Sequence, residues 1–125
     1  MNLNPSAGPQ VLRGAIRPAW GEREIWVDYA ELSLRVSPGS FFQVNLALLP
    51  AIHERIAEFL GREKVLADLY AGVGTHGLAL RARFERVFFV EGLRGAVADL
   101  AATIKNHNVP ETEVASTSVE RALRR

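Results

Sequence analysis

Hydrophobic and polar residues alternate in short runs over the first third of the chain. Residues 11–16, 24–28 and 32–36 have the patterns of short strands, and every second residue of the last segment is apolar. Proline and glycine at 38–39 predict a turn that ends this region. We therefore expect a small antiparallel β segment over residues 11–44, after a polar tail formed by the first ten residues.

The apolar spacing becomes helical after this segment. Between Asn45 and Gly61 the apolar residues recur every three to four positions, at Leu49, Ile52, Ile56 and Phe59. Asn45 is a plausible N-cap and Gly61 a plausible C′ residue. Pro50 lies near the expected start, where it would distort the first turn.

Short apolar runs then alternate with amphipathic segments to the end of the chain. Strands are expected at 64–70, 86–90 and 113–116, and helices at 75–82, 93–104 and 118–123. Strand and helix in regular alternation, with short loops, predict an α/β fold with a parallel sheet. We assign residues 45–125 to this second part.

Composition limits the possible functions. The chain has 125 residues, of which 48% are hydrophobic, and this is the length of one compact domain. Its formal net charge of +1 gives no overall electrostatic preference for nucleic acid or membrane. It has no cysteine, which excludes disulfides, thiolate zinc sites, iron–sulfur clusters and a cysteine nucleophile within this chain.

The sequence contains no sign of export or of a metal site. The first ten residues have neither the basic cluster nor the apolar core of a secretory signal, so a cytoplasmic location is the default expectation. The three histidines, His53, His76 and His107, fall on separate predicted elements without the four-residue spacing of a helical metal site. We therefore expect no bound metal.

The candidate chemistry lies in the sequence KVLADLYAGVGTHG at residues 64–77. A buried strand leads to Asp68, glycines at 72 and 74 form a tight turn, and a helix begins near Thr75. Glycine permits a ligand to approach the backbone closely, and the helix N-terminus then faces that ligand. Glu91 ends the next strand, where a carboxylate can accept hydrogen bonds from the two hydroxyls of a ribose. This pattern predicts a nucleoside-containing cofactor.

Two classes of cofactor fit this loop, and so does a purely structural role without a ligand. Residues 72–77 match G-x-G-x-x-G, which is typical of NAD or FAD sites. Asp68, four residues before Gly72, favours S-adenosylmethionine, since a carboxylate attracts its ammonium and sulfonium groups. The glycines could also serve packing alone, in a turn that binds nothing.

The sequence SPGSFFQVN at residues 37–45, followed by a helix and by DLYAGVGTHG, resembles the RNA uracil-5-methyltransferase family, which makes 5-methyluridine in transfer and ribosomal RNA. The resemblance extends from residue 11 to residue 106. It implies a partial Rossmann-like methyltransferase sheet, S-adenosylmethionine as cofactor, and tRNA or rRNA as the partner of the full-length enzyme.

The resemblance also assigns roles to single residues. Gln43 is similar to the family glutamine that contacts the cofactor, and Glu91 to the acid that binds its ribose. The remaining cofactor-binding positions that it implies are Asp68, Tyr70, Gly72, Gly74, Thr75 and, near adenine, Ser118. Members of the family also share a later Asp-Pro-Pro-Arg block, a cysteine that adds to C6 of uracil and a glutamate general base. Because the block and the cysteine are absent, we expect no catalytic residue here and no activity from this chain alone.

Two alternatives to a methyltransferase portion remain: an NAD-binding fragment of an oxidoreductase, and a non-catalytic module that binds RNA or a partner chain. The methyltransferase sheet normally has seven strands, so about three strands here predict a fragment of a larger protein. The strand at residues 64–70 would then lie at an apolar edge, through which we expect the chain to dimerise, swap segments or aggregate.

Overall fold

The computed structural model describes residues 17, 19–61 and 63–124. The elements follow one another as β1 (Ile25–Tyr29), β2 (Leu32–Val36), α1 (Leu49–Leu60), β3 (Val65–Leu69), α2 (Thr75–Leu80), the 3₁₀ turn η1 (Arg81–Arg83), β4 (Arg86–Glu91), α3 (Arg94–His107), β5 (Thr112–Ser116) and α4 (Val119–Ala122). The predicted fold class, an antiparallel β unit before a partial parallel sheet with helices, is confirmed. The predicted tail at residues 1–10 and the strand at 11–16 lie outside the described residues.

The antiparallel unit is a hairpin of β1 and β2. The strands pair in register from Ile25 opposite Val36 to Tyr29 opposite Leu32. The two residues between them, Ala30 and Glu31, both have positive φ, as a type I′ hairpin turn requires. The apolar side chains of β2 are buried, so the predicted alternation is correct.

Helix α1 begins later than predicted, and the prediction of Asn45 as its N-cap is wrong. The N-cap is Leu48, which makes no side-chain capping bond. Asn45 instead begins a turn, in which its carbonyl accepts a hydrogen bond from the Leu48 N–H at 3.3 Å. Pro50 explains this start, because proline has no N–H to donate and is tolerated only in the first helical turn. Gly61 ends the helix with φ 66°, as expected.

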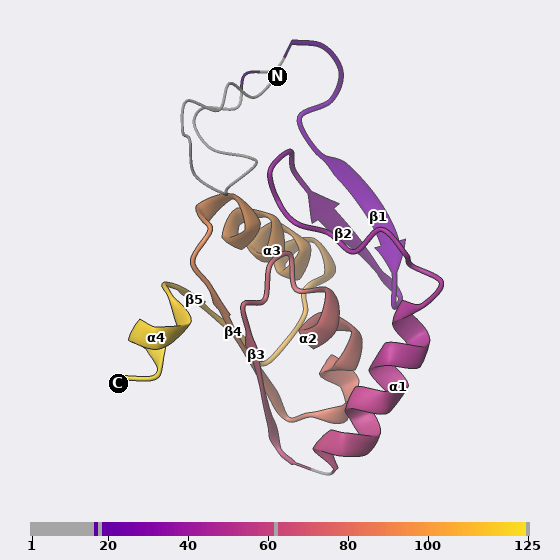
Figure 1. The fold of residues 1–125 in the computed structure, drawn as a ribbon, viewed down its shortest axis with the longest axis vertical. Helices are drawn as coiled ribbons and strands as arrows, with labels where there is room; N and C mark the ends of the chain where they lie inside the picture. Colours follow the sequence, from indigo (N-terminus) through magenta and orange to yellow (C-terminus); the bar gives the residue numbers. More distant parts are fainter. Residues whose placement is uncertain (1–16, 18, 62, 125) are drawn as a thin grey trace, which may run out of the picture.

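The second sheet is parallel and has the order β3-β4-β5. Leu66 lies opposite Val87, and Phe89 opposite Val114. Figure 1 shows α2 and α3 on one face of this sheet and α4 on the other. The carboxyl ends of all three strands therefore meet at one end of the sheet, next to the turns that lead into α2, α3 and α4.

The core lies between the sheet and the two helices α2 and α3. Phe89 and Leu100 are fully buried there, together with Leu78 of α2 and Leu66 of β3. On the opposite face of β3 the side chains are largely uncovered: Val65 is 48% exposed and Leu69 39%. Within the described residues, no helix is both long enough and apolar enough to cross a membrane.

Polar side chains of α3 join the hairpin to this core. Three residues spaced four apart accept hydrogen bonds from alternate backbone N–H groups along β2: Asp99 from Ser37, Thr103 from Arg35 and His107 from Ser33, each at 2.9 Å. An α-helix places residues four apart on one face, and a strand points alternate N–H groups to one edge. We call this set the α3 row. It completes the outer edge of β2 without a third strand.

Strand β3 pairs with β4 alone among the described residues, so one edge of it is open. An open apolar edge is a site for pairing with another chain. We predict that Ala67→Lys, on the exposed face of β3, raises the concentration at which the chain self-associates by roughly tenfold, since a lysine on an edge strand opposes pairing. Light scattering over a concentration series measures this change.

The matched control is Ala101→Lys, which makes the same change at an exposed position of α3. It should associate like the unmodified chain. A wild-type chain that stays monomeric at high concentration would contradict pairing through β3.

Candidate functional site

The glycine loop between β3 and α2 has an unusual backbone. Tyr70, Gly72 and Gly74 all have positive φ, of 59°, 58° and 85°. This region is accessible to glycine at little cost but is unfavourable for tyrosine, so the surrounding bonds must hold Tyr70 in place. One such bond runs from the Ala71 N–H to the Val90 carbonyl at 3.0 Å, which ties the loop to β4.

The three glycines of the motif have different roles. A Cβ at Gly74 would lie 2.5 Å from the Leu100 side chain, and one at Gly77 would lie 2.5 Å from Phe89. Both contacts are far too short, so these two glycines let α2 pack closely against α3 and β4. A Cβ at Gly72 would meet only the Phe41 carbonyl, at 3.8 Å. Only at Gly72 does the structure leave room for the close approach of a ligand.

Glu91 links the turns that follow β3 and β4. Its Oε2 accepts a hydrogen bond from the Gly72 N–H at 2.8 Å, and its Oε1 accepts one from the Leu93 N–H at 2.6 Å. Each carboxylate oxygen has a second lone pair, so both can still accept from another donor. Glu91 thus shapes the glycine loop and can also receive hydroxyl groups.

Asp68 lies beneath the same loop, in a partly buried position. Its Oδ2 accepts from the Gly77 N–H at 2.8 Å, in the first turns of α2. Burial raises the pKa of Asp68 above its ordinary value, against the lowering effect of the Gly77 bond and of His76, and the nearby charge of Glu91 raises it further. The two acids are therefore close enough for the charge of one to affect the other.

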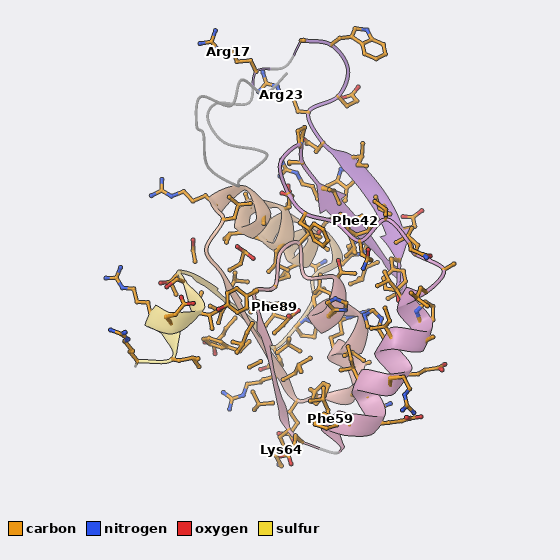
Figure 2. All side chains as sticks on the ribbon, viewed as in Figure 1. Arg17, Arg23, Phe42, Phe59, Lys64 and Phe89 are labelled. Atoms are coloured by element: carbon orange, nitrogen blue, oxygen red, sulfur yellow. The ribbon has the colours of Figure 1, made fainter. Side chains whose placement is uncertain are left out.

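The segment that follows β2 lies over this loop. The Phe41 carbonyl is the group nearest to the open side of Gly72, and the Ser40 hydroxyl would be 3.9 Å from a Cβ at Gly95. Phe42 packs against the core (Figure 2). The Phe41 side chain is exposed. Gln43, the next residue, is half-buried. Gln43 thus lies two residues beyond the Phe41 backbone, which reaches the glycine loop.

Tyr70 and Ser118 lie on the side of the site formed by β5 and α4. The Tyr70 hydroxyl donates to Glu120 at 2.9 Å, and this bond, with the charge of that carboxylate, raises the pKa of the tyrosine. Ser118 caps α4, and its Cα would be 3.9 Å from a Cβ at Gly92, directly after Glu91. Both residues are therefore next to the turns at the carboxyl ends of the strands.

Thr75 and Gly74 are buried at the start of α2. Gly74 is part of the packing between α2 and α3, since a Cβ there would meet Leu100. Among the residues expected to bind cofactor, Glu91 bonds to the Gly72 N–H and Asp68 to the Gly77 N–H, so the two acids hold the same loop. Gln43 is half-buried, two residues after the Phe41 carbonyl that lies near Gly72, and Ser118 lies beside the turn after Glu91.

The sequence interpretation missed two polar groups near the site. One is Asp99, which is completely buried. The other is a chain in which the Tyr29 hydroxyl lies 2.8 Å from His53 Nδ1, and His53 Nε2 lies 2.9 Å from His76 Nδ1. The spacing of Asp99 and Thr103 on an otherwise apolar helix face was the available signal for the first. Nothing in the sequence indicated the second.

Comparison with known proteins gives relatives of one kind. An RNA methyltransferase of Lactobacillus johnsonii, otherwise uncharacterized, is 28% identical over all of this chain, and the chain covers 28% of its length. The human tRNA (uracil-5-)-methyltransferase homolog B is 30% identical over 83% of this chain, which covers 21% of that protein. The predicted resemblance to RNA methyltransferases is confirmed.

Solved structures agree. The Pyrococcus abyssi tRNA (uracil-54, C5)-methyltransferase, solved in complex with S-adenosyl-L-homocysteine, superposes with a TM-score of 0.70 at 30% identity, over 92% of this chain and 29% of that one. No family model matches the sequence. The chain thus spans between a fifth and a third of the length of the uracil methyltransferases that it resembles.

The buried histidine predicts a pH effect on stability. Burial, and then the neighbouring His76, lower the pKa of His53 below the ordinary value of 6.5. The unfolded chain therefore binds this proton more readily than the folded chain, so the contribution of His53 to stability is lost as the pH falls through about 6.5. We expect thermal denaturation to give a smaller decrease in Tm between about pH 7.5 and about pH 5.5 for His53→Gln than for the wild type. Equal decreases in both proteins would contradict this assignment.

Proposed function

We propose that this chain is the cofactor-binding portion of an S-adenosylmethionine-dependent RNA methyltransferase that forms 5-methyluridine in tRNA or rRNA. The observation that carries the proposal is that two carboxylates at the carboxyl ends of adjacent parallel strands, Asp68 and Glu91, each bind a backbone N–H of the same loop, Gly77 and Gly72. Cofactors of open α/β sheets bind at this end. The likeness to a uracil-54 methyltransferase that holds S-adenosyl-L-homocysteine supports the choice of cofactor.

The residues present fit such a cofactor. Glu91 retains lone pairs for the two ribose hydroxyls, although its oxygens already hold Gly72 and Leu93. The Asp68 carboxylate supplies negative charge for the ammonium and sulfonium groups, and Gly72 offers a backbone without a side chain in the way. Gln43, on the segment above, would close over the methionine end, while Tyr70 and Ser118 would border the adenine side.

Uracil methylation needs groups that this chain does not hold. When bound, S-adenosylmethionine supplies the methyl group, but the uracil must first be activated by a nucleophile, for which the family uses cysteine. The 125 residues contain no cysteine. We therefore propose that this chain binds the cofactor but does not methylate RNA by itself, and that RNA is bound through the complete enzyme. The cytoplasmic location remains a prediction.

The alternative of an NAD-binding fragment rests on the match to G-x-G-x-x-G. Two glycines of that match are explained by packing against Leu100 and Phe89, without any ligand. Isothermal titration of the chain with S-adenosylhomocysteine, S-adenosylmethionine and NAD separates the proposals. Heat with the first two supports the methyltransferase portion, and heat with NAD alone would reject it. No heat with any of the three would favour a non-catalytic module that binds RNA or a protein partner.

A single substitution tests the proposed role of Asp68. Asp68→Asn keeps an acceptor for the Gly77 N–H and removes the negative charge. Burial raises the pKa of Asp68, which means that the folded state disfavours this charge, so the Tm should stay equal or rise. The affinity for S-adenosylmethionine should fall about tenfold, because the attraction to its positive groups is lost. Calorimetric titration and thermal denaturation measure the two effects.

Asp28→Asn is the matched control, since it makes the same change at an exposed position of β1. Its affinity and Tm should equal those of the wild type. If Asp68→Asn lowered the Tm and left the affinity unchanged, Asp68 would be a structural residue and not part of the cofactor site.

Glu91→Ala tests the second acid. We expect the affinity for S-adenosylhomocysteine to fall by about 1–3 kcal/mol, the range for losing hydrogen bonds to a charged group. The Tm should fall as well, because the Gly72 and Leu93 N–H groups lose their acceptor. An unchanged affinity in the same titration would remove Glu91 from the proposed site.

A further inference from the structure

A buried carboxylate on α3 holds the turn that precedes the Gln43 segment. Asp99 has no exposed surface. Its two oxygens accept three hydrogen bonds from this turn: from the Ser37 N–H at 2.9 Å, the Ser37 hydroxyl at 2.6 Å and the Ser40 hydroxyl at 2.7 Å. The Ser40 N–H also donates to the Ser37 carbonyl at 3.0 Å, which closes the turn. Both ends of the Ser37–Ser40 turn are therefore fixed to one side chain.

This arrangement is strong for physical reasons. Hydroxyl hydrogen bonds to a carboxylate are shorter and about twice as strong as neutral ones, and burial strengthens them further. Arg35 Nε lies 3.4 Å from Asp99 Oδ1, which balances the buried charge. The Ser37–Ser40 turn is therefore firmly held, although Phe41 and Val44, which follow it, are 77% and 90% exposed.

The held turn leads directly to the candidate site. Ser40 is followed by Phe41, whose carbonyl faces the open side of Gly72, and two residues later by Gln43. A shift of Ser40 would therefore move the carbonyl and the glutamine relative to the glycine loop. Asp99 itself has no exposed surface, so it would act on a bound ligand through the turn and not by touching it.

We propose that Asp99 is a positioning residue: by binding Ser37 and Ser40 it holds the Gln43 segment over Gly72, where that segment covers the bound cofactor. This inference rests on the proposed cofactor-binding function. It adds a residue of α3 that the resemblance does not include and that acts through the turn.

The test removes one hydrogen bond between Asp99 and the Ser37–Ser40 turn and leaves the buried charge of Asp99 in place. Asp99 variants risk a failure to fold, because Arg35 would lose its partner, so Ser40→Ala is the informative change. It removes only the Ser40 hydroxyl, while Phe42 still anchors the segment in the core. Ser40→Thr restores a hydroxyl. Thr103→Val is the matched control, since it removes another member of the α3 row, which bonds to the Arg35 N–H and the Asp99 carbonyl but not to the Ser37–Ser40 turn.

Two measurements are made on the 125-residue chain: amide hydrogen exchange of residues 41–44 without ligand, and calorimetric titration with S-adenosylhomocysteine. Ser40→Ala should accelerate exchange in this segment and weaken binding roughly tenfold. Ser40→Thr should behave like the wild type in both. Thr103→Val should lower the Tm and leave both the exchange of residues 41–44 and the affinity unchanged. If Ser40 had a merely structural role, Ser40→Ala would behave in the same way as Thr103→Val.

The outcomes separate the two proposals. If the wild type binds S-adenosylhomocysteine and Ser40→Ala binds it equally well, the positioning role is wrong while the proposed function stands. A loss of affinity without faster exchange also overturns the positioning role. If the wild type does not bind the compound at all, the proposed function fails, and the role of Asp99 fails with it.

Discussion

The α3 row is the interaction on which the arrangement of this molecule depends. A strand at the edge of a two-stranded hairpin leaves backbone N–H groups without partners, and such groups must be satisfied when they are buried. Here Asp99, Thr103 and His107 accept from alternate N–H groups of β2 and its continuation. Because a helix and a strand meet at matching repeats, one helix face fixes both the distance and the register of the hairpin. The segment that leaves β2 is thereby delivered to the carboxyl ends of the parallel strands.

At those ends, the groups that shape the loop are also the groups available for a ligand. Glu91 holds the Gly72 N–H and the Leu93 N–H, and Asp68 holds the Gly77 N–H. Each carboxylate keeps lone pairs that no backbone group uses. In the proposed function, these backbone bonds already hold the loop, so binding of the cofactor would require little ordering of the chain. The raised pKa of Asp68 reflects the cost of keeping this acid partly buried.

Much of this could be predicted from the sequence. The strands of the parallel sheet, the helices between them and the buried face of β2 follow from the apolar spacing, because burial of one face repeats every two residues in a strand and every three to four in a helix. The predicted start of α1 was wrong. Asn45 is a good capping residue when only its local sequence is considered, but Pro50 is tolerated only in the first turn of a helix, so the helix begins later. The glycine motif correctly indicated a tight loop but not that Gly74 and Gly77 serve packing, while a Cβ at Gly72 would meet nothing closer than the Phe41 carbonyl at 3.8 Å.

The order of the elements, the tight glycine turn after β3 and the acid at the end of β4 can all be predicted along the chain, because each depends on neighbouring residues. Which groups meet depends on the three-dimensional packing: Asp99 with the Ser37–Ser40 turn, His53 with Tyr29 and His76, and Tyr70 with Glu120. These partners are separated by 23 to 62 residues. Their contacts arise from how α1 and α3 pack on the rest of the fold, and no periodicity of the sequence records the distance between two packed elements.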